Sequence, residues 1–290
     1  MFEAIPSPYL VPYDNHFDLK AYSTAPPKDG LSKHECSKRL MDLSLEISDL
    51  QRILFAQGKY ALLLIFQAMD AAGKDSTIRT VMDCVDPNGC QAFSFEAPTH
   101  LELKHDFIWR TVNKLPPHGR IGIFNRSYYE EVLIAKVHPE LLKNQKISED
   151  EIDKTFWEQR YESILDHEKH LARNRIVILK FWLNLSKKEQ KRRFLSRIDE
   201  PQKNWKFSKA DINERQYWDE YMKAYHTAIK KTSRPWAPWY AIPADNKPYM
   251  RMCVADIIVA TLRSLPMNYP RLGPDEYGAF KEMRELLENE

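Results

Sequence analysis

The chain has 290 residues, of which 43% are hydrophobic and 29% are charged, so it contains enough apolar sequence to bury a large globular core. Its formal net charge of +2 excludes a protein that coats nucleic acid or an anionic membrane through its overall electrostatic field. Any site for a polyanion must therefore be local.

The cysteines and the apolar segments indicate a soluble cytoplasmic protein with no membrane contact. The four cysteines are widely separated and lack the spacing of a zinc site, which favours reduced thiols. Prolines and acidic residues interrupt the first residues before any apolar stretch reaches the length of a secretory signal. The longest apolar run, residues 60–66, is far shorter than the ~20 residues that cross a bilayer.

The first elements in chain order are an arm and a long helix. Residues 1–31 are rich in proline and polar residues without a clean period, which predicts an extended arm lying on the body. Ser32 and Glu35 match a capping box, and apolar residues then recur at helical spacing until Gly58 ends the pattern. We assign residues 32–290 to a single domain.

The middle of the chain alternates between strands and helices. Residues 60–66 (YALLLIF) have the continuous apolar pattern of a central parallel strand that is covered on both faces. Further strands are predicted at residues 90–95, 120–124, 175–182 and 239–242, and later helices at 187–197 and 211–231. This alternation predicts a doubly wound α/β fold with three layers, α/β/α, around a mainly parallel sheet.

A loop for binding phosphate follows the central strand directly. Residues 69–77 read MDAAGKDST, and a glycine followed by a lysine at a helix start presents backbone amides, a favourable helix dipole and a positive charge to an anion. The strict Walker motif is violated by Ala68 at the first glycine position and by Asp75 at the hydroxyl position. The predicted phosphate-binding residues of this loop are Ala71, Ala72, Gly73, Lys74, Asp75 and Ser76.

Asp70 and Asn125 are candidate metal ligands. Asp70 immediately precedes the loop amides, where its carboxylate could hold Mg²⁺ against phosphoryl oxygens, although Asp is also a favoured helix N-cap. Asn125 ends the strand at 120–124, where P-loop enzymes usually place an acidic metal ligand. Because its amide adds no charge, a nearby carboxylate is expected to compensate, and Glu130 and Glu131 are the candidates.

Arg126 and Glu130 complete the predicted catalytic set of Asp70, Lys74, Arg126 and Glu130. The Arg126 guanidinium could stabilise the charge that builds up on a transferred phosphoryl group, with a surface salt bridge as the alternative. Glu130 lies three residues after Ser127, so a capping box is as good an interpretation as a metal ligand.

Seven motifs closely resemble family-2 polyphosphate kinases, and the resemblance covers residues 32 to about 263. In chain order the motifs are AMDAAGKDSTI, GCQAFSFEAPT, HDFIWR, GIFNRSYYEEVL, FLSRIDEPQKNWKFS, RQYWDEYMKAY and APWYAIPADNK. The sequence NRSYYEE is similar to the branch that phosphorylates both nucleoside monophosphates and diphosphates, whereas other branches have aspartate at the position of Asn125. The resemblance implies a thymidylate-kinase-like P-loop fold, inorganic polyphosphate as a substrate, dependence on Mg²⁺ with Mn²⁺ as a substitute, and a homo-oligomer, either a dimer or a tetramer.

The resemblance also implies a nucleotide pocket and a lid. Comparison with thymidylate kinases places Phe95 and Arg110 at the acceptor nucleotide, with plain core packing as the alternative for Phe95. A basic helical lid is predicted at about residues 186–215, because a linear polyanion needs several cations in a row. Its predicted polyphosphate-binding residues, together with Arg126, are Arg192, Arg193, Arg197, Lys203 and Lys206.

The leading functional hypothesis is direct, Mg²⁺-assisted transfer of a terminal polyphosphate phosphoryl group to AMP or ADP, giving ADP and ATP. An ATP-dependent nucleoside monophosphate kinase is the alternative enzyme. A non-catalytic module that binds RNA or polyphosphate through the lid cations is the alternative from another class, although no specific nucleic acid partner is expected.

Overall fold

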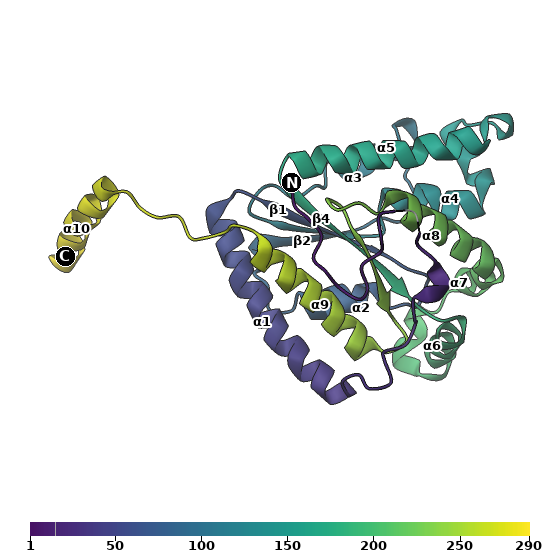
Figure 1. Ribbon diagram of the computed structural model, residues 1–290, viewed down its shortest axis with the longest axis horizontal. Coiled ribbons are helices and arrows are strands. Elements are labelled where there is room, and N and C mark those ends of the chain that lie inside the picture. Colours follow the sequence, from purple (N-terminus) through teal and green to yellow (C-terminus); the bar gives the residue numbers. More distant parts are fainter. Residues whose placement is uncertain (15) are drawn as a thin grey trace.

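The computed structural model describes residues 1–14 and 16–290, and a five-stranded parallel sheet lies at its centre (Figure 1). The strands lie in the order β2-β3-β1-β4-β5, and every neighbouring pair is parallel. Their bounds are β1 (Ala61–Gln67), β2 (Cys90–Ser94), β3 (Ile121–Asn125), β4 (Ile176–Asn184) and β5 (Trp239–Pro243). The predicted α/β class and all five predicted strands are confirmed, with bounds that differ by at most two residues.

The topology places the end of β1 at the point where a ligand is expected. From β1 the chain moves to β2 and β3 on one side, and then crosses to β4 and β5 on the other. Loops at such a switch point diverge and leave a crevice at the carboxyl ends of the strands. The phosphate loop follows β1 at this crevice.

Strand β1 is apolar from Ala61 to Phe66, as expected for a strand with helices on both faces of its sheet. All seven of its residues are buried. Leu62, Leu64 and Phe66 join the core under one layer of helices, while Leu63 and Ile65 join the core under the other. This alternation is the period of a strand whose two faces are both inside the protein.

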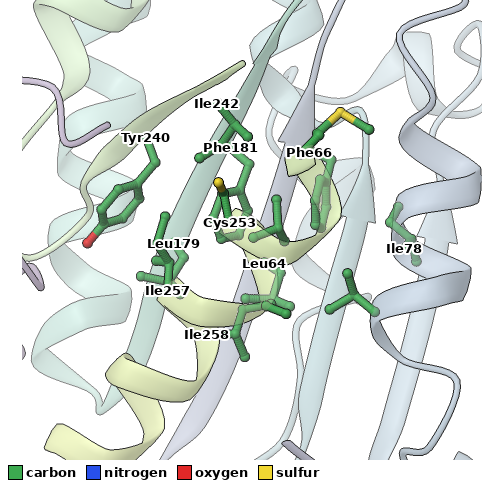
Figure 2. Close-up of a cluster of buried hydrophobic side chains, with 14 of the residues drawn as sticks. Leu64, Phe66, Ile78, Leu179, Phe181, Tyr240, Ile242, Cys253, Ile257 and Ile258 are labelled. Carbon is green, nitrogen blue, oxygen red and sulfur yellow. The ribbon is translucent and has the colours of Figure 1, made fainter. Parts of the chain in front are cut away.

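The first helical layer consists of α1 (Lys33–Gln57), α2 (Lys74–Val81) and α9 (Lys247–Ser264). The capping box of Ser32 and Glu35 is present, and Gly58 ends α1 in the left-handed conformation with φ 61°. Figure 2 shows the core beneath this layer, where Phe66 of β1 stacks on Phe181 of β4 with ring centroids 5.1 Å apart.

The second layer contains α3 (Trp109–Val112), α4 (Ile134–Val137), α5 (Lys154–Arg173) and α8 (Trp218–Thr232). The prediction of one helix over residues 211–231 is wrong, because the segment divides into α7 (Lys209–Glu214), a 3-10 turn and α8. Helix α8 buries an aromatic face against the sheet, whereas α7 buries no residue and pairs with the lid helix α6 (Lys187–Asp199) through Asp211 and Arg197. One straight helix could not reach both partners.

The N-terminal residues lie along the exposed edge of the sheet. Leu10 forms an antiparallel bridge with Tyr240 of β5, the Val11 amide donates to the Trp239 carbonyl over 2.9 Å, and Val11 is fully buried. An edge strand covered in this way offers fewer free backbone groups to other chains. At the other terminus, α10 (Pro274–Glu288) lies apart from the helices that cover the sheet (Figure 1). None of the helices in the described residues is long and apolar enough to span a membrane.

Candidate active site

The loop between β1 and α2 has the strained backbone that a close approach to an anion requires. Gly73 is the N-cap of α2 with φ 102°, and Ala71 also has a positive φ of 61°. A Cβ at position 73 would lie 3.3 Å from Ser76 Oγ and 3.6 Å from Lys247 Cε, contacts that a small shift would relieve, so it is the positive φ that requires glycine here. Positive φ in a residue other than glycine is uncommon and clusters at functional sites.

Lys74 is the first residue of α2 and is held inside the loop. Its Nζ donates to the Ala68 carbonyl over 2.7 Å, and the residue is only 9% exposed. Burial lowers the pKa of Lys74, while the carboxylate of Asp70 opposes this shift. An ammonium with so little water around it interacts strongly with any phosphate that enters the loop.

Asp70 does not cap α2, so the interpretation of this residue as a helix N-cap is wrong. The N-cap position belongs to Gly73 and carries no side-chain cap. Instead, Asp70 Oδ1 accepts a hydrogen bond from Arg126 Nη2 over 3.2 Å. Arg126 has φ 64°, and its amide donates to the Phe66 carbonyl of β1 over 3.0 Å. The carboxylate of Asp70 after β1 and the guanidinium of Arg126 after β3 therefore lie together beside the phosphate loop.

Glu130 faces this pair, and the predicted capping box does not form. The Ser127 hydroxyl accepts from the Tyr129 amide, at the start of the 3-10 helix Tyr128–Val132. With the Gln67 amide oriented to satisfy its neighbours, Gln67 donates to Glu130 Oε1 over 2.8 Å. Burial raises the pKa of Glu130, although Arg126 and Lys74 oppose the shift. The predicted catalytic residues Asp70, Lys74, Arg126 and Glu130 thus interact as one electrostatic cluster.

Asn125 lies beside the start of α2. Its Nδ2 donates to Asp75 Oδ1 over 2.6 Å and to Ser94 Oγ over 3.2 Å, and its Oδ1 is buried without a hydrogen-bond partner. A buried orphan oxygen on a residue that contacts Asp75 suits Mg²⁺, which binds through few protein oxygens and keeps waters and substrate phosphates as its other ligands. The described residues hold no group of three or more His, Cys, Asp or Glu side chains that would form a complete protein cage.

The two residues predicted to bind the nucleotide lie together. The Arg110 guanidinium lies over the Phe95 ring at 5.3 Å, and Arg110 Nη2 donates to the Glu96 carbonyl over 2.7 Å. Phe95 is also 6% exposed and packs edge-on against Phe124 with centroids 4.9 Å apart. Core packing therefore accounts for one side of the Phe95 ring, and its contact with a nucleotide stays a prediction.

The lid cations divide into two kinds. Arg193 is 6% exposed, and its guanidinium donates to the carbonyls of Ala71, Ala72 and Ala244. The prediction that it faces a polyanion is corrected, because these bonds direct it to the inner side of the phosphate loop. Its neighbour Arg192 is exposed and pairs with Glu189.

The other lid cations hold the lid together. Arg197 donates to Asp211 and to the Lys206 carbonyl, and Lys203 pairs with Glu200 over 2.6 Å. Lys206 lies over the ring of Trp205, which is 79% exposed. Lys203 and Lys206, like Arg192, are predicted cations that remain near the lid surface.

Replacing each of the two neighbouring arginines separately distinguishes a residue that supports the loop from one that is free to contact substrate. We expect Arg193→Gln to lower the free energy of unfolding by about 2–4 kcal/mol, because two loop carbonyls and the Ala244 carbonyl after β5 lose a charged donor. The matched variant Arg192→Gln should stay within about 0.5 kcal/mol of wild type, since exposed ion pairs contribute little. Urea unfolding of both variants measures the difference, and equal stabilities would show that Arg193 does not support the loop.

Sequence reasoning missed several polar residues that the fold brings to the loop. Gln190 of α6 donates to the Asp70 carbonyl over 3.0 Å. Burial raises the pKa of Asp211, and the nearby Asp70 carboxylate raises it further. Lys247 of α9 lies against Gly73. Only Lys247 lies within one of the seven motifs, and each of the three residues lies more than 100 residues from the loop along the chain, so no local pattern pointed to them.

Comparison with known proteins gives a consistent result. A sequence model described as polyphosphate kinase 2 matches residues 30–269. The chain is 54% identical over 242 residues to a Rhodopseudomonas palustris protein named ADP-polyphosphate phosphotransferase, covering 83% of the chain and 84% of that relative. It is 41% identical over 268 residues to a Meiothermus ruber protein named AMP/ADP-polyphosphate phosphotransferase, covering 91% and 95%.

A solved structure with the same architecture comes from Arthrobacter aurescens TC1 and is described as polyphosphate kinase 2. It superposes with a TM-score of 0.86 at 36% identity, covering 97% of this chain and 98% of the other.

Proposed function

The chain belongs to the polyphosphate kinase 2 family, and from this premise we propose that it transfers phosphoryl groups between inorganic polyphosphate and nucleoside monophosphates and diphosphates. The observation that supports this most directly is the cluster of Asp70, Lys74 and Arg126 at the ends of β1 and β3. The cluster combines strained loop amides, a buried ammonium and a guanidinium, which is a site built for phosphate rather than for a neutral substrate.

The reaction needs no covalent intermediate with the protein. A terminal phosphate oxygen of AMP or ADP attacks the last phosphorus of the polyphosphate chain, and the bridging P–O bond to the next phosphate breaks. The products are a nucleotide longer by one phosphate and a polyphosphate shorter by one. Because negative charge spreads over the transferred phosphoryl group, cations held in fixed positions contribute most to catalysis.

The residues divide this task between them. Loop amides and Lys74 bind the phosphates next to the broken bond, and Arg126, oriented by Asp70, stabilises the equatorial oxygens. Glu130, with its raised pKa, orients the acceptor phosphate. The shortened polyphosphate can leave without protonation, since its terminal phosphate is a stable anion.

Mg²⁺ is part of the proposal, with Mn²⁺ as a substitute. Its predicted ligands are Asp70, the orphan Oδ1 of Asn125 and Glu130, which would hold the ion near the substrate phosphates. When bound, the ion would neutralise negative charge on the phosphoryl oxygens. With the metal bound, Asp70 would coordinate the ion and interact less with Arg126.

The location and the oligomeric state of the protein are also part of the proposal. We expect the protein to act in the cytoplasm as a homo-oligomer, on the basis of the sequence resemblance. Light scattering coupled to size exclusion measures the mass, and the mass of one chain, 34.2 kDa, would contradict the oligomer.

The decisive experiment compares donors and acceptors. Purified protein with AMP, long-chain polyphosphate and Mg²⁺ should give ADP and then ATP, quantified by chromatography, and EDTA should abolish both products. ADP in place of AMP should give ATP directly. If AMP is phosphorylated by ATP and not by polyphosphate, the protein is an ATP-dependent nucleoside monophosphate kinase. If no donor supports transfer while polyphosphate still binds, it is a binding module.

A further inference from the structure

The turn between α7 and α8 connects the second helical layer to the phosphate loop. It contains Glu214, the last residue of α7, and Arg215, the first residue of the following 3-10 helix. Glu214 bonds to His138 in the body of the protein, whereas Arg215 bonds to Gln190 on the lid helix α6. We refer to His138, Glu214, Arg215 and Gln190 together as the lid strut.

The outer end of the lid strut is fixed to the body through Glu214. Its Oε2 accepts a hydrogen bond from Nε2 of His138 over 3.0 Å and another from the Tyr221 hydroxyl of α8 over 2.8 Å. The other ring nitrogen of His138, Nδ1, lies 3.1 Å from Glu140 Oε1, and the ring packs edge-on against Tyr217 with centroids 4.7 Å apart. Glu214 therefore cannot move without breaking two hydrogen bonds.

The inner end of the lid strut reaches the phosphate loop through Gln190. Arg215 Nη1 donates to Gln190 Oε1 over 2.8 Å and to the Lys187 carbonyl over 3.1 Å. Gln190 is 1% exposed, and its Nε2 donates to the Asp70 carbonyl over 3.0 Å. Both ends of one buried amide are occupied, so the position of the Asp70 peptide is coupled to that of Arg215.

Gln190 lies on the face of α6 that holds the loop. It bonds to the Asp70 carbonyl, and Arg193, three residues later on the same helix, bonds to the next two carbonyls, those of Ala71 and Ala72. In a planar trans peptide the C=O group and the following N–H group point in opposite directions. The bond from Gln190 therefore turns the amide of Ala71 away from α6, towards the other side of the loop.

We propose that Gln190 and Arg215 are positioning residues for phosphoryl transfer, because the lid strut fixes the backbone of Asp70 and thereby the carboxylate that orients Arg126. The inference rests on the proposed function. Asp70 Oδ1 accepts from Arg126 Nη2, so a shift of the Asp70 peptide would displace the guanidinium as well. A displacement of about 1 Å at a reacting centre costs up to about 10²-fold in rate.

The residue type at position 190 provides a way to break the lid strut at one bond. Glutamine accepts from a guanidinium and donates to a carbonyl at the same time, whereas glutamate accepts and, when ionised, cannot donate. Gln190→Glu therefore keeps the bond from Arg215, now as an ion pair, and removes the bond to Asp70. The size of the side chain stays the same.

The test compares Gln190→Glu with Gln216→Glu, the same substitution at an exposed residue next to Arg215. With polyphosphate and AMP, we expect kcat of Gln190→Glu to fall about 30-fold, because Asp70 is no longer held. KM for both substrates should stay within about twofold of wild type, since the bond acts on the transition state rather than on binding. The midpoint of urea unfolding should match wild type, and the control should match wild type in all three measurements.

A double-variant cycle tests whether the contacts act as one unit. Glu214→Met removes both anchors of the turn and should by itself lower kcat about tenfold. Because this effect passes through Gln190, the double variant Glu214→Met/Gln190→Glu should be about as fast as Gln190→Glu alone. Independent effects would instead multiply to about 300-fold.

Each outcome decides the proposal. Wild-type kcat in Gln190→Glu would overturn it, and so would effects that multiply in the double variant. If Gln190→Glu does not fold, Arg215→Gln breaks the same connection at a partly exposed residue and should lower kcat about tenfold with KM unchanged. Failure of the proposed function gives a different result, because wild type would then transfer no phosphoryl group from polyphosphate.

Discussion

Replacing Lys74 with methionine should lower kcat for transfer from polyphosphate to AMP at least about 10³-fold while the protein stays folded. Lys74 is 9% exposed, so its ammonium acts on the phosphoryl group with little screening by water. Methionine keeps most of the aliphatic stem and removes the charge. It also removes the hydrogen bond to the carbonyl of Ala68, the residue that follows β1.

The control for this variant is Ser76→Ala in the same loop. The Ser76 hydroxyl donates to the Gly73 carbonyl over 3.0 Å, so its loss removes a local bond and no charge. We expect a reduction in kcat of less than about tenfold. Initial rates with saturating AMP and Mg²⁺ measure both variants, and circular dichroism confirms folding. If Lys74→Met kept wild-type activity, the phosphate loop would have no part in the mechanism.

The second large effect concerns stability. Lys180 of β4 and Glu168 of α5 are both fully buried and form an ion pair of 2.6 Å. Lys180 Nζ also donates to the Tyr129 hydroxyl and the Thr232 carbonyl, and Glu168 accepts from the hydroxyls of Tyr128 and Tyr129. Tyr128 and Tyr129 lie between Arg126 and Glu130, so this network holds the segment that carries both site residues.

We expect Glu168→Gln to lower the free energy of unfolding by about 3–5 kcal/mol, because it leaves Lys180 as an uncompensated charge in the core. Burial already lowers the pKa of Lys180 to about 8 against the opposing attraction of Glu168. Without that carboxylate, Lys180 must either lose its proton or remain as an unpaired charge in the core, and both lower the free energy of unfolding. Urea unfolding at neutral pH measures the change.

Two controls separate this effect from a general sensitivity of α5. Glu162→Gln replaces an exposed glutamate on the same helix and should leave stability within about 0.5 kcal/mol of wild type. The double variant Glu168→Gln/Lys180→Met removes the stranded charge and should recover part of the loss. A single variant as stable as wild type would mean that the ion pair contributes nothing to the fold.

Local sequence patterns predicted most of the sheet correctly. Residues 60–66 were identified as a central strand because a strand covered on both faces must be apolar throughout, and the other four strands also lie where short apolar runs alternate with helical patterns. Gly73 and Lys74 marked the start of a helix, and the structure confirms it. The boundary within residues 211–231 was missed, because both halves have helical composition and only their different packing partners separate them.

The phosphate loop, its lysine and the strand end with Asn125, Arg126 and Glu130 could be identified from sequence, because short-range chemistry defines them: a turn that needs glycine, amides at a helix start, and charged residues after a buried strand. The tertiary structure alone determined what each charge faces. Arg192 and Arg193 are adjacent in a basic helix, yet one is exposed and the other binds loop carbonyls. Lys247 reaches Gly73 across more than 170 residues of chain. Coulomb interactions and burial depend on distances in space, and a linear sequence does not contain those distances until the chain has folded.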